Sequence, residues 1–140
     1  MSDTNWLDQV KWDKDGLAPV IAQDIKTGSI LMLAWANRDA LAATQAEKRA
    51  VYWSRSRQQL WRKGEESGNI QQLHDIYLDC DNDAICYVVD QIGGVACHTG
   101  RPNCFFQRLE VDEDKTGPAW RVSSEIVKSP DQMYRNPKNS

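Results

Sequence analysis

The chain has 140 residues, of which 41% are hydrophobic and 26% charged, and its formal net charge is -3. This length favours a single domain with one hydrophobic core, and the apolar runs are too short to span a bilayer. The acidic balance disfavours a general nucleic-acid binder, although a local cluster of arginines can still bind a small anionic substrate.

The first third of the chain predicts two strands followed by a helix. Residues 16–36 are rich in Val and Ile on either side of a turn at 26–28, a pattern typical of two short strands. Asn37 is a typical helix N-cap, and basic residues near the expected C-terminal end suit the helix dipole. We therefore predict one helix over residues 38–49.

The segments between residues 50 and 111 predict further strands. Aromatic and β-branched residues recur there at period two, which indicates a β-rich α+β domain with one substantial helix. From Glu110 onward the chain is polar, holds three prolines and shows no sustained period. We interpret residues 1–109 as the folded domain and residues 110–140 as a C-terminal arm or tail.

A basic segment that contains glycine spans residues 52–69. Glycine lets backbone N–H groups approach an anion, arginine matches phosphate oxygens bidentately, and tryptophan can stack on a heteroaromatic ring. Neither a Walker signature nor a G-x-G-x-x-G motif occurs, so a site for nucleoside triphosphates or dinucleotides lacks support. A surface hairpin with solvated arginines is the alternative. The candidate substrate-binding residues are Arg55, Arg57, Trp61, Lys63, Gly64, Ser67, Gly68 and Asn69.

Asp79, Asp81 and Asp83 stand at alternate positions of one short segment. Carboxylates suit a hard cation such as Mg²⁺, and in an extended segment the three would point to one side and Cys80 to the other. The spacing resembles the start of an EF-hand calcium loop. However, Ala84 stands where that loop needs glycine, so we reject an EF-hand. A solvated acidic loop without a cation is the alternative.

The chain holds four cysteines, and no basic, apolar leader opens it. We therefore expect the cytoplasm, where thiols stay reduced and cysteines serve as ligands, nucleophiles or core residues. Cys97 and Cys104 flank a loop that can fold both sulfurs onto one ion, while Cys80 stands alone and Cys86 is predicted to be a core thiol. Three ligands would leave one position open on a tetrahedral zinc. Unligated cysteines and a disulfide between Cys97 and Cys104 are the alternatives.

Together these segments resemble one family, phosphoribosyl-AMP cyclohydrolase of histidine biosynthesis. The resemblance covers roughly residues 20–106. It implies a hydrolase with a catalytic domain at residues 1–109 that breaks the N1–C6 bond of the adenine ring in 1-(5-phosphoribosyl)-AMP. A fused pyrophosphohydrolase domain for the preceding step is not expected in so short a chain. The likeness rests on YWSRSRQQLWRKGEESGN (52–69), DCDNDA (79–84) and CHTGRPNCF (97–105), with LMLAWANRDAL (31–41).

The resemblance also implies an architecture and two metals. The fold would be a pseudobarrel or roll of mostly antiparallel strands capped by one α-helix, in a homodimer whose zinc site is shared between subunits. The substrate would be a small phosphorylated nucleotide, and the protein would bind neither nucleic acid nor a membrane. The implied ligands are Cys80, Cys97 and Cys104 for zinc, and Asp79, Asp81 and Asp83 for magnesium.

In the implied mechanism, zinc lowers the pKa of a water that attacks C6 of the ring. Three thiolates weaken this effect, so a nearby base is needed; we predict that His98 is this base and that His74 is structural. Asn69 stands where many relatives carry His, which leaves the role of that position open. The rivals are a zinc-stabilised dimeric nucleotide-binding module without catalysis and a single-stranded RNA binder. A fourth protein ligand on zinc would favour the module, whereas the acidic balance argues against RNA.

Overall fold

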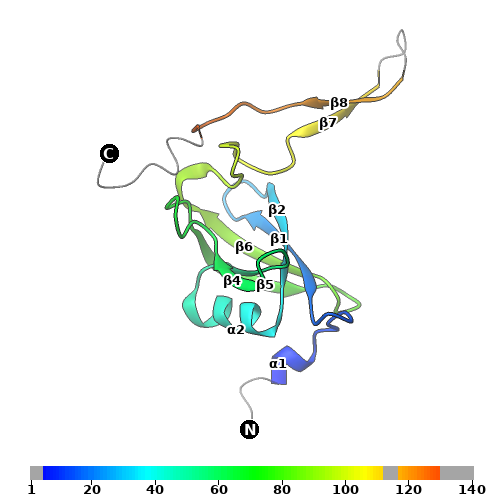
Figure 1. Ribbon diagram of the computed structural model, residues 1–140, viewed down its shortest axis with the longest axis vertical. Coiled ribbons are helices and arrows are strands. Elements are labelled where there is room, and N and C mark those ends of the chain that lie inside the picture. Colours follow the sequence, from blue (N-terminus) through cyan, green and yellow to red (C-terminus); the bar gives the residue numbers. More distant parts are fainter. Residues whose placement is uncertain (1–4, 112–116, 130–140) are drawn as a thin grey trace.

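The computed structural model describes residues 5–111 and 117–129, which form eight strands and one helix of ten residues (Figure 1). Two shorter helical turns complete the list of elements. The predicted β-rich domain with one substantial helix is therefore confirmed. The helices are α1 (Asn5–Asp8), α2 (Arg38–Glu47) and the 3₁₀ turn η1 (Ile92–Gly94); the strands are β1 (Ala18–Asp24), β2 (Ile30–Ala36), β3 (Val51–Ser54), β4 (Gln59–Arg62), β5 (Gln71–Leu78), β6 (Ile85–Gln91), β7 (Gln107–Glu110) and β8 (Ala119–Val122).

Four strands form the central sheet, in the order β2-β1-β6-β5. β1 pairs antiparallel with β2 and parallel with β6, and β5 pairs antiparallel with β6. The hairpins β3–β4 and β7–β8 are separate antiparallel pairs. Most pairings are therefore antiparallel, as predicted. The described strands do not close into a barrel, because β2 and β5 remain edges of the central sheet.

One face of the central sheet carries the hydrophobic core. Alternate residues of β1 and β6 are buried there, and they share one cluster with Leu41 of α2 and Tyr52 of β3. The intervening residues, such as Ile21 and Cys86, point to the opposite face because side chains alternate along a strand. Cys86 is half-buried there and lies outside the core cluster, so the prediction of a core thiol is wrong.

Helix α2 begins at Arg38 because Asn37 caps it. Asn37 Oδ1 accepts a hydrogen bond of 2.8 Å from the N–H of Ala40, as the sequence predicts for an N-cap. The helix ends at Glu47, since Lys48 takes a left-handed conformation with φ of 60°. The basic residues expected in its last turn therefore lie just beyond it.

The hairpin β3–β4 is joined to the core at its buried end. Ala50 donates its N–H to the carbonyl of Gln71 at 2.9 Å, and the Tyr52 hydroxyl donates to Gln71 Oε1 at 2.5 Å. The hydroxyl of Thr44 in α2 accepts from the N–H of Val51 at 3.0 Å. These bonds hold the hairpin over the core, so that the end of β4 lies beside the segment that follows β6.

The hairpin β7–β8 projects from the body of the protein as an arm (Figure 1). Its register pairs Leu109 with Trp120 and Arg108 with Arg121, so one face of the arm is apolar and the other is charged. The boundary predicted at residue 110 falls at the end of β7, and the last part of the predicted tail, 130–140, lies outside the described residues. No helix in the described ranges is both long enough and apolar enough to cross a membrane.

Candidate functional site

The three predicted magnesium ligands lie in the tight turn between β5 and β6. Carboxylate oxygens of Asp79, Asp81 and Asp83 all lie within 4.8 Å of one another, and the three residues are exposed. Asp79 Oδ1 accepts hydrogen bonds from the N–H groups of Asp83 at 2.9 Å and Ala84 at 3.2 Å. The segment is therefore a turn and not the extended strand considered above, but the turn still brings the three carboxylates together.

The carboxylates of Asp79, Asp81 and Asp83 in this turn repel one another. The pKa of Asp83 is raised, first by desolvation and then by the charges of Asp81 and Asp79. Desolvation acts on Asp79 as well, but hydrogen bonds from the backbone of Asp83 and Ala84 outweigh it and lower the pKa of Asp79. The turn thus offers several carboxylate oxygens whose negative charges repel one another. Such oxygens are the ligands that a hard divalent cation prefers.

Cys97 and Cys104 are brought together by the loop that follows η1. The N–H of Cys97 donates to the carbonyl of Arg101 at 3.1 Å, and the N–H of Gly100 donates to the carbonyl of Cys97 at 2.9 Å. At Gly100 φ is +90°, and an added Cβ would lie 1.8 Å from a backbone oxygen, so this bend requires glycine. Beyond it the N–H of Cys104 donates to the carbonyl of Leu31 in β2 at 2.7 Å. The closed loop therefore places both cysteines at the β2 edge of the sheet.

The sulfurs of the two cysteines face each other. Burial, the charge of Cys97 and a hydrogen bond with its thiol together raise the pKa of Cys104 to about 12. Over all its atoms, Cys104 is an exposed residue. Cys97 is only 4% exposed, and its sulfur accepts a hydrogen bond of 3.1 Å from Thr99 Oγ1. The Cys104 thiol is therefore neutral near pH 7 unless a cation stabilises its thiolate.

Lys63, the residue after β4, lies near the two cysteines. Its ammonium donates a hydrogen bond to the carbonyl of Ala96, the residue before Cys97. Burial lowers the pKa of Lys63, whereas the thiolates of Cys104 and Cys97 act in the opposite direction. A positive charge thus stands beside the two candidate zinc ligands. No local sequence pattern predicts this contact, because β4 and the cysteine loop are far apart in the chain.

Cys80 does not join this pair within one chain. It is exposed in the β5–β6 turn, where its thiol donates a long hydrogen bond of 3.7 Å to Asp81 Oδ1. Within the described parts of the chain, only the three aspartates form a group of three or more possible ligands within 4.8 Å. Sulfurs around a single zinc lie about 4 Å apart. The structure therefore brings together two of the three predicted zinc ligands, Cys97 and Cys104, and places the third elsewhere on the sheet.

Five of the eight candidate substrate-binding residues line one pocket with a volume of ≈ 190 Å³. Arg62 also lines it, but its guanidinium is held by Glu47 through bonds of 2.7 and 2.6 Å and is therefore not free for a phosphate. The ring of Trp61 forms one wall of the pocket, and its centroid lies 5.9 Å from Nζ of Lys63. The five residues are Arg57, Trp61, Lys63, Gly64 and Ser67.

The other three candidates do not line this pocket. Arg55 lines a different pocket of ≈ 330 Å³, and its guanidinium lies 4.5 Å above the ring of Trp35. Gly68 has φ of 81° in the turn that follows β4. Asn69 is only 5% exposed, and an added Cβ at Gly93 would lie 2.2 Å from its Oδ1. Asn69 thus fills a buried space beside Gly93.

Both histidines are exposed. His98 follows Cys97 directly in the cysteine loop, whereas His74 is the residue that the β5–β6 register skips between Leu73 and Asp75. His98 therefore lies beside a candidate metal ligand, and His74 occupies an irregular position in the middle of a strand.

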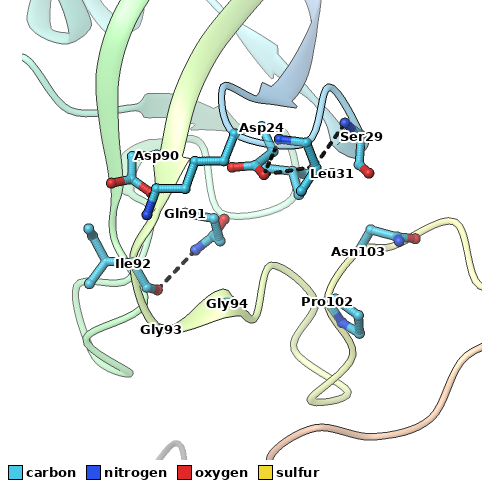
Figure 2. Close-up of a pocket in the computed structure, with 12 residues that line it drawn as sticks. Asp24, Ser29, Leu31, Asp90, Gln91, Ile92, Gly93, Gly94, Pro102 and Asn103 are labelled. Carbon is cyan, nitrogen blue, oxygen red and sulfur yellow. Dashed lines mark hydrogen bonds and ion pairs between the residues drawn. The ribbon is translucent and has the colours of Figure 1, made fainter.

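A pocket of ≈ 590 Å³ borders the cysteine loop at residues 102–103 (Figure 2). Its other walls are the β1–β2 turn and the end of β6 with η1. Lys26 pairs with Asp90 at 3.4 Å across one side, and Asp24 adds a second carboxylate. Carboxylates outnumber ammonium groups here, whereas in the pocket of the basic segment Arg57 and Lys63 balance Glu65 and Glu66. A phosphate therefore fits this pocket less well than the pocket of the basic segment. Its lining comes from three separate segments, which no sequence motif connects.

One family model and several curated relatives are similar to this chain. The sequence model of the family described as phosphoribosyl-AMP cyclohydrolase matches residues 32–106. This range includes Cys97 and Cys104 as well as the aspartate turn, which holds Asp79, Asp81 and Asp83. The phosphoribosyl-AMP cyclohydrolase of Stutzerimonas stutzeri (strain A1501) is 55% identical over 135 residues, which cover 96% of this chain and 98% of the relative. The protein of that name from Pseudomonas syringae pv. syringae (strain B728a) is 56% identical over 93% of this chain and 95% of its own. The one from Pseudomonas aeruginosa (strain LESB58) is 52% identical, with 94% of each chain covered.

Proposed function

The chain belongs to the phosphoribosyl-AMP cyclohydrolase family, and from this membership we propose that it hydrolyses the N1–C6 bond of the adenine ring in 1-(5-phosphoribosyl)-AMP, in histidine biosynthesis. The observation that carries the proposal is the similarity to relatives of that name along almost the whole chain. The alternative of a nucleotide-binding module without catalysis is not favoured, because the relatives reported above are named as enzymes.

The reaction adds one water across a ring bond of the 6-imino form of the substrate. The oxygen of the water bonds to C6, and the C6–N1 bond breaks. The two protons of the water end on N1 and on the exocyclic nitrogen, which gives the formimino group and the carboxamide of the product. A base must carry a proton between these positions. His98 is our candidate, since it is exposed and adjacent to Cys97.

We assign a zinc site to Cys97 and Cys104 of one subunit and Cys80 of a second. Two adjacent sulfurs suit a soft-ligand metal, and the raised pKa of Cys104 reflects how unfavourable its thiolate is beside Cys97 without a cation. When bound, zinc supplies the Lewis acidity that makes water nucleophilic near neutral pH. The ammonium of Lys63 offsets part of the negative charge that three thiolates bring. Because one chain supplies only two adjacent sulfurs, this assignment requires a homodimer.

We assign magnesium to the β5–β6 turn, with Asp79, Asp81 and Asp83 as ligands. The support is that three exposed carboxylates, all acceptors, lie within 4.8 Å of one another. The phosphorylated substrate is assigned to the pocket of the basic segment. There Arg57 is exposed for a phosphate, and the half-buried ring of Trp61 is available to stack on a base.

The cytoplasm is the compartment that we propose for this reaction. All four cysteines are free, as a reducing environment keeps them and as a thiolate metal site requires. Neither the fold nor the site calls for a nucleic acid or a membrane, and we propose neither as a partner.

The test is an absorbance assay for ring opening, with phosphoribosyl-AMP as substrate and purified protein with and without a metal chelator. We expect turnover in the untreated protein, loss of at least about 100-fold with chelator, and recovery when zinc is returned. A metal-loaded protein that binds the substrate but leaves the ring closed would favour the binding module over the hydrolase.

A further inference from the structure

The segment that follows the arm returns to the cysteine loop and lies against it (Figure 1). We call residues 123–128 the strap; they follow the end of β8 at Val122 and form neither helix nor strand. Hydrogen bonds attach the strap to the loop at three places. The family model ends at residue 106, so its sequence pattern carries no information about the strap.

The first two attachments are at Phe106 and Arg101. The carbonyl of Phe106 accepts two hydrogen bonds from Ser123, one of 2.6 Å from its N–H and one of 2.9 Å from its hydroxyl. Nε of Arg101 donates to the carbonyl of Ser124 at 3.1 Å. The guanidinium of Arg101 also lies 4.3 Å from the centroid of the Phe106 ring. The strap and the aromatic ring thus hold the Arg101 side chain together.

The third attachment is at Gly100, in the bend of the loop. Its carbonyl accepts hydrogen bonds from the N–H groups of Val127 at 2.8 Å and Lys128 at 3.2 Å. A Cβ on Gly100 would lie 1.8 Å from the carbonyl oxygen of Lys128 and 2.9 Å from Cγ2 of Ile126. The glycine that the bend requires is therefore also the residue that lets the strap approach the loop so closely.

Gly100 and Arg101, which the strap holds, are both bonded to the backbone of Cys97. The carbonyl of Arg101 accepts the N–H of Cys97 at 3.1 Å, and Gly100 donates its N–H to the carbonyl of Cys97 at 2.9 Å. Cys104 has a separate support, its bond to Leu31 in β2. The sheet thus holds one cysteine, and the strap holds the bend that carries the other. A displacement of the strap would therefore change the separation of the two sulfurs.

We propose that the strap is a positioning element for the metal site: it holds the bend at Gly100 and Arg101 so that the sulfur of Cys97 stays beside that of Cys104. The strap acts through the loop, and none of its residues is assigned as a ligand or a catalytic group. Because an ordered loop loses less conformational entropy when a metal binds, a pair of cysteines held in this way binds more tightly. The inference rests on the proposed zinc site and adds a support outside the ligands.

The experiment compares Val127→Pro with Val127→Ala in the full chain. Proline removes the N–H that the Gly100 carbonyl accepts, whereas alanine keeps it and shortens a side chain that is 63% exposed. Competition with a chromophoric chelator measures the affinity for zinc. Val127→Pro should bind zinc at least about 10-fold more weakly than wild type, at an unchanged urea midpoint of unfolding. Val127→Ala should bind zinc as wild type does.

A second measurement requires neither zinc nor activity. Phenylarsine oxide forms two As–S bonds with a pair of adjacent thiols and releases one water, and it binds a single thiol only weakly. In metal-free protein with a Cys80→Ala background, its affinity reports how close Cys97 and Cys104 are. This affinity should fall at least about 10-fold when Val127→Pro is added, and it should not change when Val127→Ala is added.

A folded Val127→Pro protein that binds zinc and the arsenical as tightly as wild type would overturn the inference. Weaker zinc binding with unchanged arsenical binding would also contradict it, because the sulfurs would still be adjacent. Equal losses in Val127→Ala would show that the side chain is responsible and not the N–H, which contradicts it as well. If Val127→Pro does not fold, Arg101→Met removes the donor to Ser124 and decides the question by the same two measurements.

Failure of the inference is distinguishable from failure of the proposed function. Loss of arsenical binding in Val127→Pro, combined with a wild type that holds no zinc or leaves the ring closed, would support the strap and refute the zinc site or the hydrolysis. A wild type that holds zinc and opens the ring, with a Val127→Pro variant that matches it in both measurements, would refute the strap and leave the function intact.

Discussion

Cys104 donates its backbone N–H to the carbonyl of Leu31 at 2.7 Å. This bond fastens the cysteine loop to the edge strand β2, so the sulfurs of Cys97 and Cys104 are held together within one chain. Lys63 adds a positive charge on the same side. Two of the three proposed zinc ligands are thus held together by the fold, whereas Cys80 lies in the turn between β5 and β6.

Replacing Cys97 with alanine should abolish both zinc binding and hydrolysis. A site with two thiolates in place of three binds zinc far more weakly, and the remaining Cys104 loses its adjacent partner. Metal analysis of the purified protein and the ring-opening assay measure the two losses. The matched control is Cys86→Ala, which removes a thiol of the same size from the face of the sheet opposite the core.

The control should keep its zinc and lose no more than about 1 kcal/mol of folding stability, because Cys86 is half-buried and outside the core cluster. Equal zinc loss in both variants would show that the assignment of ligands among the cysteines is wrong.

Asp81→Asn should weaken the response to magnesium and leave zinc bound. The substitution removes one negative charge from the aspartate turn without altering a sulfur, and the two metals differ in ligand chemistry. Activity as a function of magnesium concentration is the measurement, with zinc content determined on the same samples. Zinc loss with an unchanged magnesium response would contradict the division of this turn between the two metals.

Lys63→Gln should lower the affinity for zinc by roughly 10-fold, since the variant loses the charge that offsets the thiolates. Competition with a chromophoric chelator measures this affinity directly. Lys26→Gln is the control, because that ammonium is 72% exposed and pairs with Asp90 at 3.4 Å. If both variants bind zinc as wild type does, Lys63 has no electrostatic role at the site.

Tyr87 should make the protein less stable in strong alkali. Its hydroxyl is buried and donates to the carbonyl of Val51 at 3.2 Å, and burial raises its pKa above the ordinary value of 10.0. Below pH 10 both states keep the proton. Above it the unfolded state loses the proton first, so stability falls by up to about 1.4 kcal/mol per pH unit for this group.

Urea unfolding between about pH 8 and pH 11 checks this dependence. Tyr87→Phe should lose about 1 kcal/mol near pH 8 with its hydrogen bond, yet show a shallower fall above pH 10. Tyr52 is also buried with a raised pKa, so part of the fall should remain in the variant. A variant as steep as wild type would contradict the role of Tyr87.

Local patterns in the sequence predicted the parts of the fold that local interactions determine. Asn37 caps α2 because its side chain reaches an N–H three residues ahead, and the turn before β2 is closed by Thr27, which donates its N–H to Asp24 at 3.1 Å. The prediction that Cys86 is a core thiol is wrong. Its strand is apolar on both faces, and no local signal says which face of such a strand is covered.

The site was predictable only where its residues are close in sequence. The three aspartates are neighbours, and a turn brings them together as well as a strand would. The contact of Lys63 with the carbonyl of Ala96 joins two elements through the fold of the whole domain, and residue spacing carries no trace of it. In the arm, β7 lies within the range where the sequence predicts strands, whereas β8 lies in the part predicted as an arm or tail, because the residues after Glu110 show no sustained pattern.

The most direct test of a zinc site shared between two subunits is complementation between two inactive variants, Cys80→Ala and Cys104→Ala. After subunits exchange, a mixed dimer carries both substitutions in one composite site and all three cysteines in the other. Random exchange makes about half of the dimers mixed, each with one working site, so roughly a quarter of wild-type activity should return. No recovery after verified exchange would contradict the shared site and show that each zinc site is built within one chain.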